Sequence, residues 1–105
     1  MDEHPPQTIR NYVPGHRFEA AVDGRTAVLT YQVRTDGSML FVHTVVPQML
    51  RGRGIGKKLV EFALHTARER GLKVVPQCSM VADYMSKHPE THDLLAPDTA
   101  GTLDL

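Results

Sequence analysis

The segment LRGRGIGKKL, Leu50 to Leu59, decides the fold, because the apolar pattern of the chain changes there. Before it, apolar and polar residues alternate as in strands; after it, apolar residues recur every three or four positions as in an amphipathic helix. Three glycines stand at every second position, and four basic side chains surround them without an acid. The free N–H groups at a helix N-terminus favour an anion. The segment therefore predicts a pyrophosphate site at a strand–helix junction.

Two nucleotide motifs are excluded by the spacing of this segment. A P-loop needs four residues between its first glycine and the Gly-Lys pair, but Gly52 and Gly56 are separated by three. A dinucleotide fingerprint needs G-x-G-x-x-G, whereas this chain has G-x-G-x-G. A basic surface loop, solvated or touching RNA, stays open as the alternative.

The residues before the segment predict three antiparallel strands. RFEAAV (17–22) alternates and ends at Asp23-Gly24, a strong hairpin signal. TAVLTYQV (26–33) alternates again and is followed by a turn at Asp36-Gly37. MLFVHTVV (39–46) is more continuously apolar, as expected of a central strand.

The residues after the segment predict a helix, a short strand and a second helix. Apolar residues at helical spacing run from Ile55 to Arg70, and Gly71 ends the helix. LKVVP (72–76) is typical of a buried strand, and SMVADYMSKH (79–88) of a shorter helix with Ser79 as N-cap. The order β-β-β-α-β-α predicts an α/β (α+β) fold with a mixed, mainly antiparallel sheet.

Length and composition indicate one ordinary domain. The 105 residues suffice for one modest core, and a net charge of zero argues against nucleic acid or membrane as a partner of the whole chain. We expect a flexible arm over residues 1–14, with a short extended piece at Ile9 to Val13, a single domain over 15–95 and a tail over 96–105. A single cysteine and an acidic, proline-rich start unlike a signal peptide predict a cytoplasmic location.

The glycine segment resembles the motif of a known family. Arg51, Gly54 and Gly56, spaced R-x-x-G-x-G after a strand and at the start of a helix, are similar to the pyrophosphate-binding motif of GNAT-type N-acetyltransferases, which bind acetyl-CoA. The pattern from Phe41 to Glu90 resembles the small stand-alone YjdJ-type branch of that superfamily. The resemblance covers about residues 16–95 and implies a compact GNAT-like acyl-CoA N-acyltransferase fold.

The resemblance also implies the contacts with acetyl-CoA. The end of the third strand would hold the pantetheine arm through backbone hydrogen bonds, with a β-bulge there, and the N–H groups of residues 52–57 would meet the pyrophosphate. Small residues at Gly54 and Gly56 leave room for a phosphate beside the backbone. The expected contacts are Thr44, Val45, Val46, Arg51, Gly52, Arg53, Gly54, Ile55, Gly56, Lys57, Lys58 and Lys87.

Three residues are candidates for catalysis. The resemblance implies that Tyr84 protonates the departing CoA thiolate; the alternative is a ring packed in the core with its hydroxyl in water. His43 is a candidate base, or else a half-buried histidine bonded to a carbonyl. Cys78 precedes a helix N-terminus, which favours a thiolate and covalent acyl transfer; the alternative is a small buried apolar residue. No residue pattern indicates a metal site.

The sequence thus predicts an N-acetyltransferase-like protein that transfers an acetyl group from acetyl-CoA to an unidentified amine or protein acceptor. The alternative is a CoA-binding or protein-interaction module with little or no catalysis. The resemblance implies that usual members of the family are longer, and we expect the region that typically builds the amine pocket to be absent from these 105 residues. We expect no metal, no nucleic-acid partner and no membrane association, and either a monomer or a homodimer.

Overall fold

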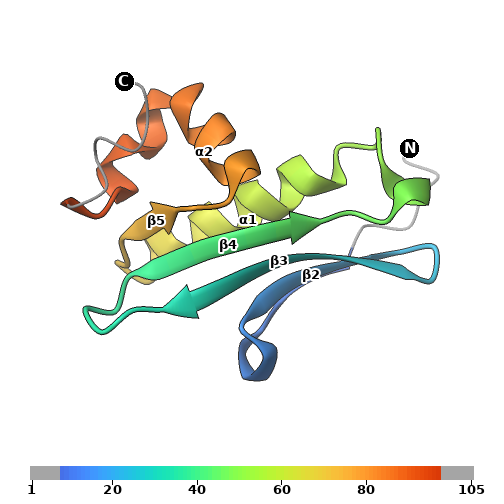
Figure 1. Cartoon of the computed structure of the whole chain (residues 1–105), viewed down its shortest axis with the longest axis horizontal. Coiled ribbons are helices and arrows are strands. Elements are labelled where there is room, and N and C mark those ends of the chain that lie inside the picture. Colours follow the sequence, from blue (N-terminus) through green and yellow to red (C-terminus); the bar gives the residue numbers. More distant parts are fainter. Residues whose placement is uncertain (1–7, 98–105) are drawn as a thin grey trace.

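A computed structural model describes residues 8–97 of the chain. Two helices cover a five-stranded sheet, and three short 3-10 helices complete the fold (Figure 1). The strands are β1 (Thr8–Tyr12), β2 (Arg17–Val22), β3 (Arg25–Val33), β4 (Met39–Val45) and β5 (Val74–Pro76). The helices are α1 (Ile55–Glu69) and α2 (Ser79–Ser86), with 3-10 helices η1 (Val13–Gly15), η2 (Gln48–Leu50) and η3 (Pro89–Leu94).

The strands lie in the sheet in sequence order, β1-β2-β3-β4-β5. The first four are antiparallel neighbours, whereas β4 and β5 are parallel because α1 connects them. The mixed, mainly antiparallel sheet of the predicted α+β fold is therefore confirmed. Asp23 and Gly24 both have positive φ, 52° and 75°, which fits the tight turn predicted between β2 and β3.

The core lies between α1 and one face of the sheet. The helix turns its spaced apolar residues inward, and Ile55, Leu59 and Ala63 are almost fully buried. Gly71, with φ of 67°, follows the helix, and the N–H of Leu72 donates to the Ala67 carbonyl at 2.8 Å. This left-handed ending is the one predicted from the sequence.

Aromatic rings fill the centre of this core. The ring of Phe18 on β2 lies 5.2 Å from that of Tyr31, 6.2 Å from that of Phe41 and 5.9 Å from that of Phe62, between ring centroids. Tilted and edge-on arrangements of this kind are favourable for aromatic pairs. Phe18 therefore joins β3, β4 and α1 at one point.

The structure differs from the expected arm at the N-terminus. Thr8–Tyr12 forms an edge strand paired with β2, and Ile9 lies opposite the buried Ala20. The Tyr31 hydroxyl donates to the side-chain oxygen of Asn11 at 2.7 Å, which fixes the strand from the core side. This strand overlaps the short extended piece expected at Ile9 to Val13, and pairing with β2 joins that piece to the sheet. Residues 1–7 of the expected arm lie outside the described part.

The C-terminal half shows smaller differences. Cys78, not Ser79, is the N-cap of α2, and it makes no side-chain capping bond. Beyond α2 the chain forms η3 where the pattern suggested little structure. Leu95 then bridges to Val74, and the N–H of Ala96 donates to the Val74 carbonyl at 2.9 Å, so the ordered chain passes the expected boundary at residue 95. The rest of the predicted tail, residues 98–105, is not described.

Candidate functional site

The loop between β4 and α1 has the backbone of an anion site. Gly52 and Gly54 have φ of 83° and 74°, a left-handed conformation that favours glycine. Gly54 is the N-cap of α1, no side chain caps the helix, and its first turn contains no acid. A Cβ at Gly52 or Gly54 would meet nothing within 4 Å. Open space thus lies beside the unbonded N–H groups at the positive end of the helix dipole.

We expect Gly54→Ala to lower the free energy of unfolding by about 1–2 kcal/mol, because a left-handed backbone is strained with any Cβ. Urea denaturation measures the loss. Lys58→Ala is the control, since Lys58 is exposed within α1 and alanine is favourable in a helix. Equal losses in the two variants would contradict this explanation of Gly54.

Gly56 has a packing reason for being glycine. It is buried, and a Cβ there would lie 2.6 Å from the Met80 sulfur and 3.5 Å from Cγ2 of Val46. Met80 extends from the first turn of α2 onto the first turn of α1. The expectation that Gly56 leaves room for a phosphate is therefore wrong for this structure: the room is taken by Met80.

The four basic side chains of the loop have two different roles. The Nε of Arg51 donates to the Val46 carbonyl at 3.2 Å, and Nη1 of Arg53 contacts Oδ2 of Asp23 at 2.9 Å. Arg51 thus contacts the residue just after β4, and Arg53 attaches the loop to the turn between β2 and β3. Lys57 and Lys58 are exposed and form no ion pair within residues 8–97. Of the four cations, the lysines are the ones left to attract an anion.

A β-bulge in β4 decides which side chains face the helices. Tyr31 lies opposite Phe41, but the next residue of β3, Thr30, lies opposite His43, so Val42 is the extra residue. Paired residues share a face, and Thr44 lies opposite the buried Leu29. The bulge therefore turns Thr44 toward the core side and His43 toward the opposite, exposed side. It stands at Val42, before the expected position at 44–46.

Cys78 contacts β4 on both sides of the bulge. Its N–H donates to the Phe41 carbonyl at 2.8 Å, and its sulfur lies 3.2 Å from the Thr44 hydroxyl oxygen. Cys78 is 5% exposed. The structure thus brings Cys78 and Thr44 together, whereas His43 lies on the other face of the sheet.

Tyr84 lies away from this pair and faces α1. Its hydroxyl donates to Oε2 of Glu61 at 3.3 Å, and its ring stacks on His88 with centroids 3.9 Å apart. Tyr84 lies six positions after Cys78 in sequence, about 9 Å along the helix axis at 1.5 Å per residue. Lys87, expected near the CoA phosphates, contacts Asp83 at 3.3 Å and is exposed. The structure places neither side chain at the Cys78–Thr44 contact.

The environment of Tyr84 raises the pKa of its phenol. Burial is the largest cause, followed by the negative charge of Glu61, the hydrogen bond to it, and the charge of Glu90.

We expect Glu61→Gln to lower the pKa of Tyr84 toward the ordinary tyrosine value, as followed by NMR of the tyrosine rings during a pH titration. Because the folded-state pKa is raised, the stability it contributes is present below the ordinary tyrosine pKa and is lost as the pH rises through the folded value. An unchanged Tyr84 titration in Glu61→Gln would contradict this.

Comparison with known proteins agrees with this arrangement. The profile of a family described as GCN5-related N-acetyl-transferase matches residues 17–94, which is most of the chain. This chain belongs to the GCN5-related N-acetyltransferase family. The match runs from β2 to η3 and includes the glycine loop, Cys78 and Tyr84.

Curated relatives are similar to this chain over a shorter segment. Protein NATD1 of Xenopus tropicalis is 35% identical over 63 residues, and that of Homo sapiens is 36% identical over 63 residues. The matched segment covers 60% of this chain and 58% and 56% of the two relatives. The chain thus spans less than two thirds of the length of the curated relatives it matches.

Sequence reasoning missed the partners of three candidate site residues. Asp23 holds Arg53, Met80 covers Gly56, and Glu61 binds the Tyr84 hydroxyl. Each lies far along the chain from its partner, so no local spacing signals the contact. Within residues 8–97, no group of three or more His, Cys, Asp and Glu could hold a metal ion, and no helix there is long and apolar enough to span a bilayer.

Proposed function

We propose that this member of the family binds acetyl-CoA and transfers its acetyl group to an amine. The observation that carries the proposal is the β4–α1 loop, where an uncapped helix N-terminus opens onto free space beside Gly52 and Gly54. A pyrophosphate fits such a site, because backbone N–H groups and the helix dipole both favour negative charge. Lys57 and Lys58 would add charge at its rim.

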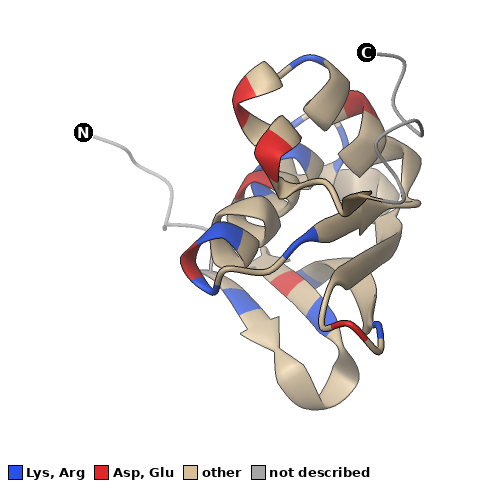
Figure 2. Ribbon diagram, turned by 90° about the vertical axis from the view of Figure 1, so that its left-hand side faces the viewer, with Lys and Arg blue, Asp and Glu red and all other residues tan. Residues whose placement is uncertain are grey.

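The surrounding residues fit the rest of the co-substrate. Val45, at the outer end of β4, and Val46, just beyond it, adjoin the loop and would hold the pantetheine arm. Charge distribution favours this over the RNA-contacting alternative, because Arg53 is paired with Asp23 and the acidic and basic segments are interspersed over the molecule (Figure 2). Bound acetyl-CoA would supply an activated thioester.

We assign the acyl-transfer chemistry to the contact between Cys78 and Thr44. In the covalent route, the Cys78 sulfur bonds to the acetyl carbon while the carbon–sulfur bond to CoA breaks, and the thiol proton passes to the leaving CoA sulfur. The amine nitrogen then bonds to the acetyl carbon and releases Cys78, which regains a proton from the amine. Thr44 is placed to hold the Cys78 thiol. In the direct route the amine nitrogen bonds to the acetyl carbon as the carbon–sulfur bond to CoA breaks. Cys78 gives its proton to the CoA thiolate, and the proton lost by the amine restores the Cys78 thiol.

Thermal melting tests the binding step. We expect CoA and acetyl-CoA at millimolar concentration to raise the melting temperature by several degrees, through preferential binding to the folded state, and ATP to raise it less. No shift with either CoA compound would overturn the proposed function.

Intact-mass measurement after incubation with acetyl-CoA tests the route. The covalent route predicts one added acetyl group, absent in Cys78→Ser. CoA release with an amine, without an adduct in the wild type, would instead support direct transfer.

One observation favours the second candidate function, a CoA-binding module without catalysis. His43 lies on the exposed face and the Tyr84 hydroxyl is bonded to Glu61, so two of the three candidate catalytic groups stand away from Cys78. Stabilisation by CoA with neither an adduct nor CoA release across a panel of amines would support the module. The acceptor, the oligomeric state and the cytoplasmic location stay predictions.

A further inference from the structure

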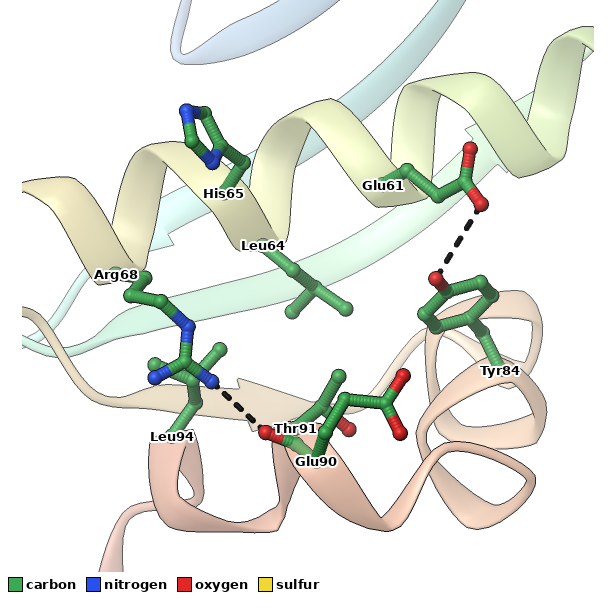
Figure 3. A pocket seen from close by; sticks show the side chains of 8 residues that line it. All are labelled: Glu61, Leu64, His65, Arg68, Tyr84, Glu90, Thr91 and Leu94. Atoms are coloured by element: carbon green, nitrogen blue, oxygen red, sulfur yellow. Dashed lines mark hydrogen bonds between the residues drawn. The ribbon is translucent and has the colours of Figure 1, made fainter.

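A pocket between α1, α2 and η3 lies apart from the loop and from the Cys78–Thr44 contact. Its volume is about 190 Å³, below the roughly 300 Å³ at which cofactor-sized pockets begin. Eight residues line it (Figure 3): Glu61, Leu64, His65, Arg68, Tyr84, Glu90, Thr91 and Leu94. It is therefore too small for CoA and needs a different occupant.

The charged groups of the pocket are unevenly engaged. Arg68 donates from both terminal nitrogens to Asp93 at 2.8 Å and also to the Glu90 carbonyl at 2.9 Å, so its charge is already neutralised. The Glu61 carboxylate accepts only the Tyr84 hydroxyl among the described residues. Figure 3 shows the Glu61 and Glu90 carboxylates on the Tyr84 side of the pocket, with Arg68 on the other side. Oε2 of Glu90 contacts Nδ1 of His88 at 3.0 Å, so Glu90 is engaged as well. The Glu61 carboxylate is therefore the negative charge left beside the Tyr84 hydroxyl.

The lining excludes several classes of ligand. An anion would face the Glu61 carboxylate, with the nearby arginine already paired. The described residues contain no group of ligands suited to a metal ion. A purely apolar ligand would leave Glu61 and Tyr84 without water, which is costly for polar groups. An organic cation with an apolar chain fits, because Leu64 and Leu94 supply apolar surface next to the carboxylates.

We propose that this pocket binds a primary ammonium group carried on a short aliphatic chain. The ammonium replaces water at the Glu61 carboxylate and the Tyr84 hydroxyl oxygen, and the chain lies against Leu64 and Leu94. At roughly 30 Å³ for each water-sized group, the pocket holds about six such groups, the size of an ammonium with four or five carbons. The site lies about 9 Å along α2 from Cys78 and does not depend on the proposed acetyl transfer.

NMR titration of the full chain with n-butylammonium chloride tests this site. We expect millimolar binding that shifts the backbone amide signals of Glu61, Leu64 and Tyr84, and no comparable shift with 1-butanol, which has the same chain without the charge. Glu61→Gln removes the charge and keeps the shape, and should weaken binding about fivefold, as for the loss of an exposed ion pair.

Asp83→Asn is the matched control, because Asp83 is exposed, stands next to Tyr84 in sequence and does not line the pocket. It should leave the affinity for n-butylammonium unchanged. Equal shifts with 1-butanol, or unchanged affinity in Glu61→Gln, would overturn the proposal. Because CoA is absent from this titration, its outcome is separate from that of the melting experiment.

Discussion

Replacing Phe18 with alanine is expected to lower the free energy of unfolding by about 3–5 kcal/mol, as for other fully buried aromatic residues. Phe18 is 0% exposed, and its ring contacts those of Tyr31, Phe41 and Phe62. Removing the ring leaves a cavity between β3, β4 and α1, and these elements cannot all move inward to fill it. Because small domains are stable by only about 5–15 kcal/mol, the loss is a large share of the total.

Urea denaturation followed by circular dichroism measures this loss. Val33→Ala serves as the control, because Val33 is 57% exposed and should lose less than about 0.5 kcal/mol. A loss below about 1 kcal/mol in Phe18→Ala would show that these rings do not form the centre of the core.

The second large effect is expected at the loop. Replacing Lys57 and Lys58 together with alanine should weaken CoA binding about tenfold, because each exposed cation near a phosphate contributes up to about 1 kcal/mol. Isothermal titration calorimetry at low salt measures the change, and added salt should reduce the difference between wild type and variant.

The matched control removes two cations elsewhere. Arg25 and Arg70 are both exposed and lie outside the loop, at the start of β3 and after the end of α1. The variant with alanine at both positions should bind CoA as the wild type does. Equal weakening in the two double variants would mean that overall charge, and not the loop, attracts the ligand.

Much of the fold followed from local pattern. The alternation in RFEAAV, the Asp23-Gly24 turn and the apolar stripe from Ile55 each depend on residues close in sequence, and each is found as predicted. For β1 only a short extended piece within a loose arm was predicted, because the place of this strand in the sheet depends on pairing with β2. Local sequence carries little information about such an edge strand.

The site was predicted less completely than the fold. The glycine loop was located by spacing and by its position between strand and helix. The side of the sheet on which His43 and Thr44 lie was not predicted. The segment MLFVHTVV is apolar almost throughout and gives no signal of the bulge at Val42. A one-residue bulge reverses the facing of every later side chain in the strand. Contacts such as Arg53 with Asp23 join residues far apart in sequence, and only the fold reveals them.

The central claim, that the β4–α1 loop binds the pyrophosphate of CoA, is tested most directly by calorimetry with CoA and with pantetheine. Pantetheine has the thiol arm without the pyrophosphate and the nucleotide. We predict measurable binding of CoA, at least tenfold weaker binding of pantetheine, and a loss of most of this difference when Lys57 and Lys58 are both alanine. Equal affinity of the wild-type chain for CoA and pantetheine, or no binding of CoA at millimolar concentration, would contradict the claim.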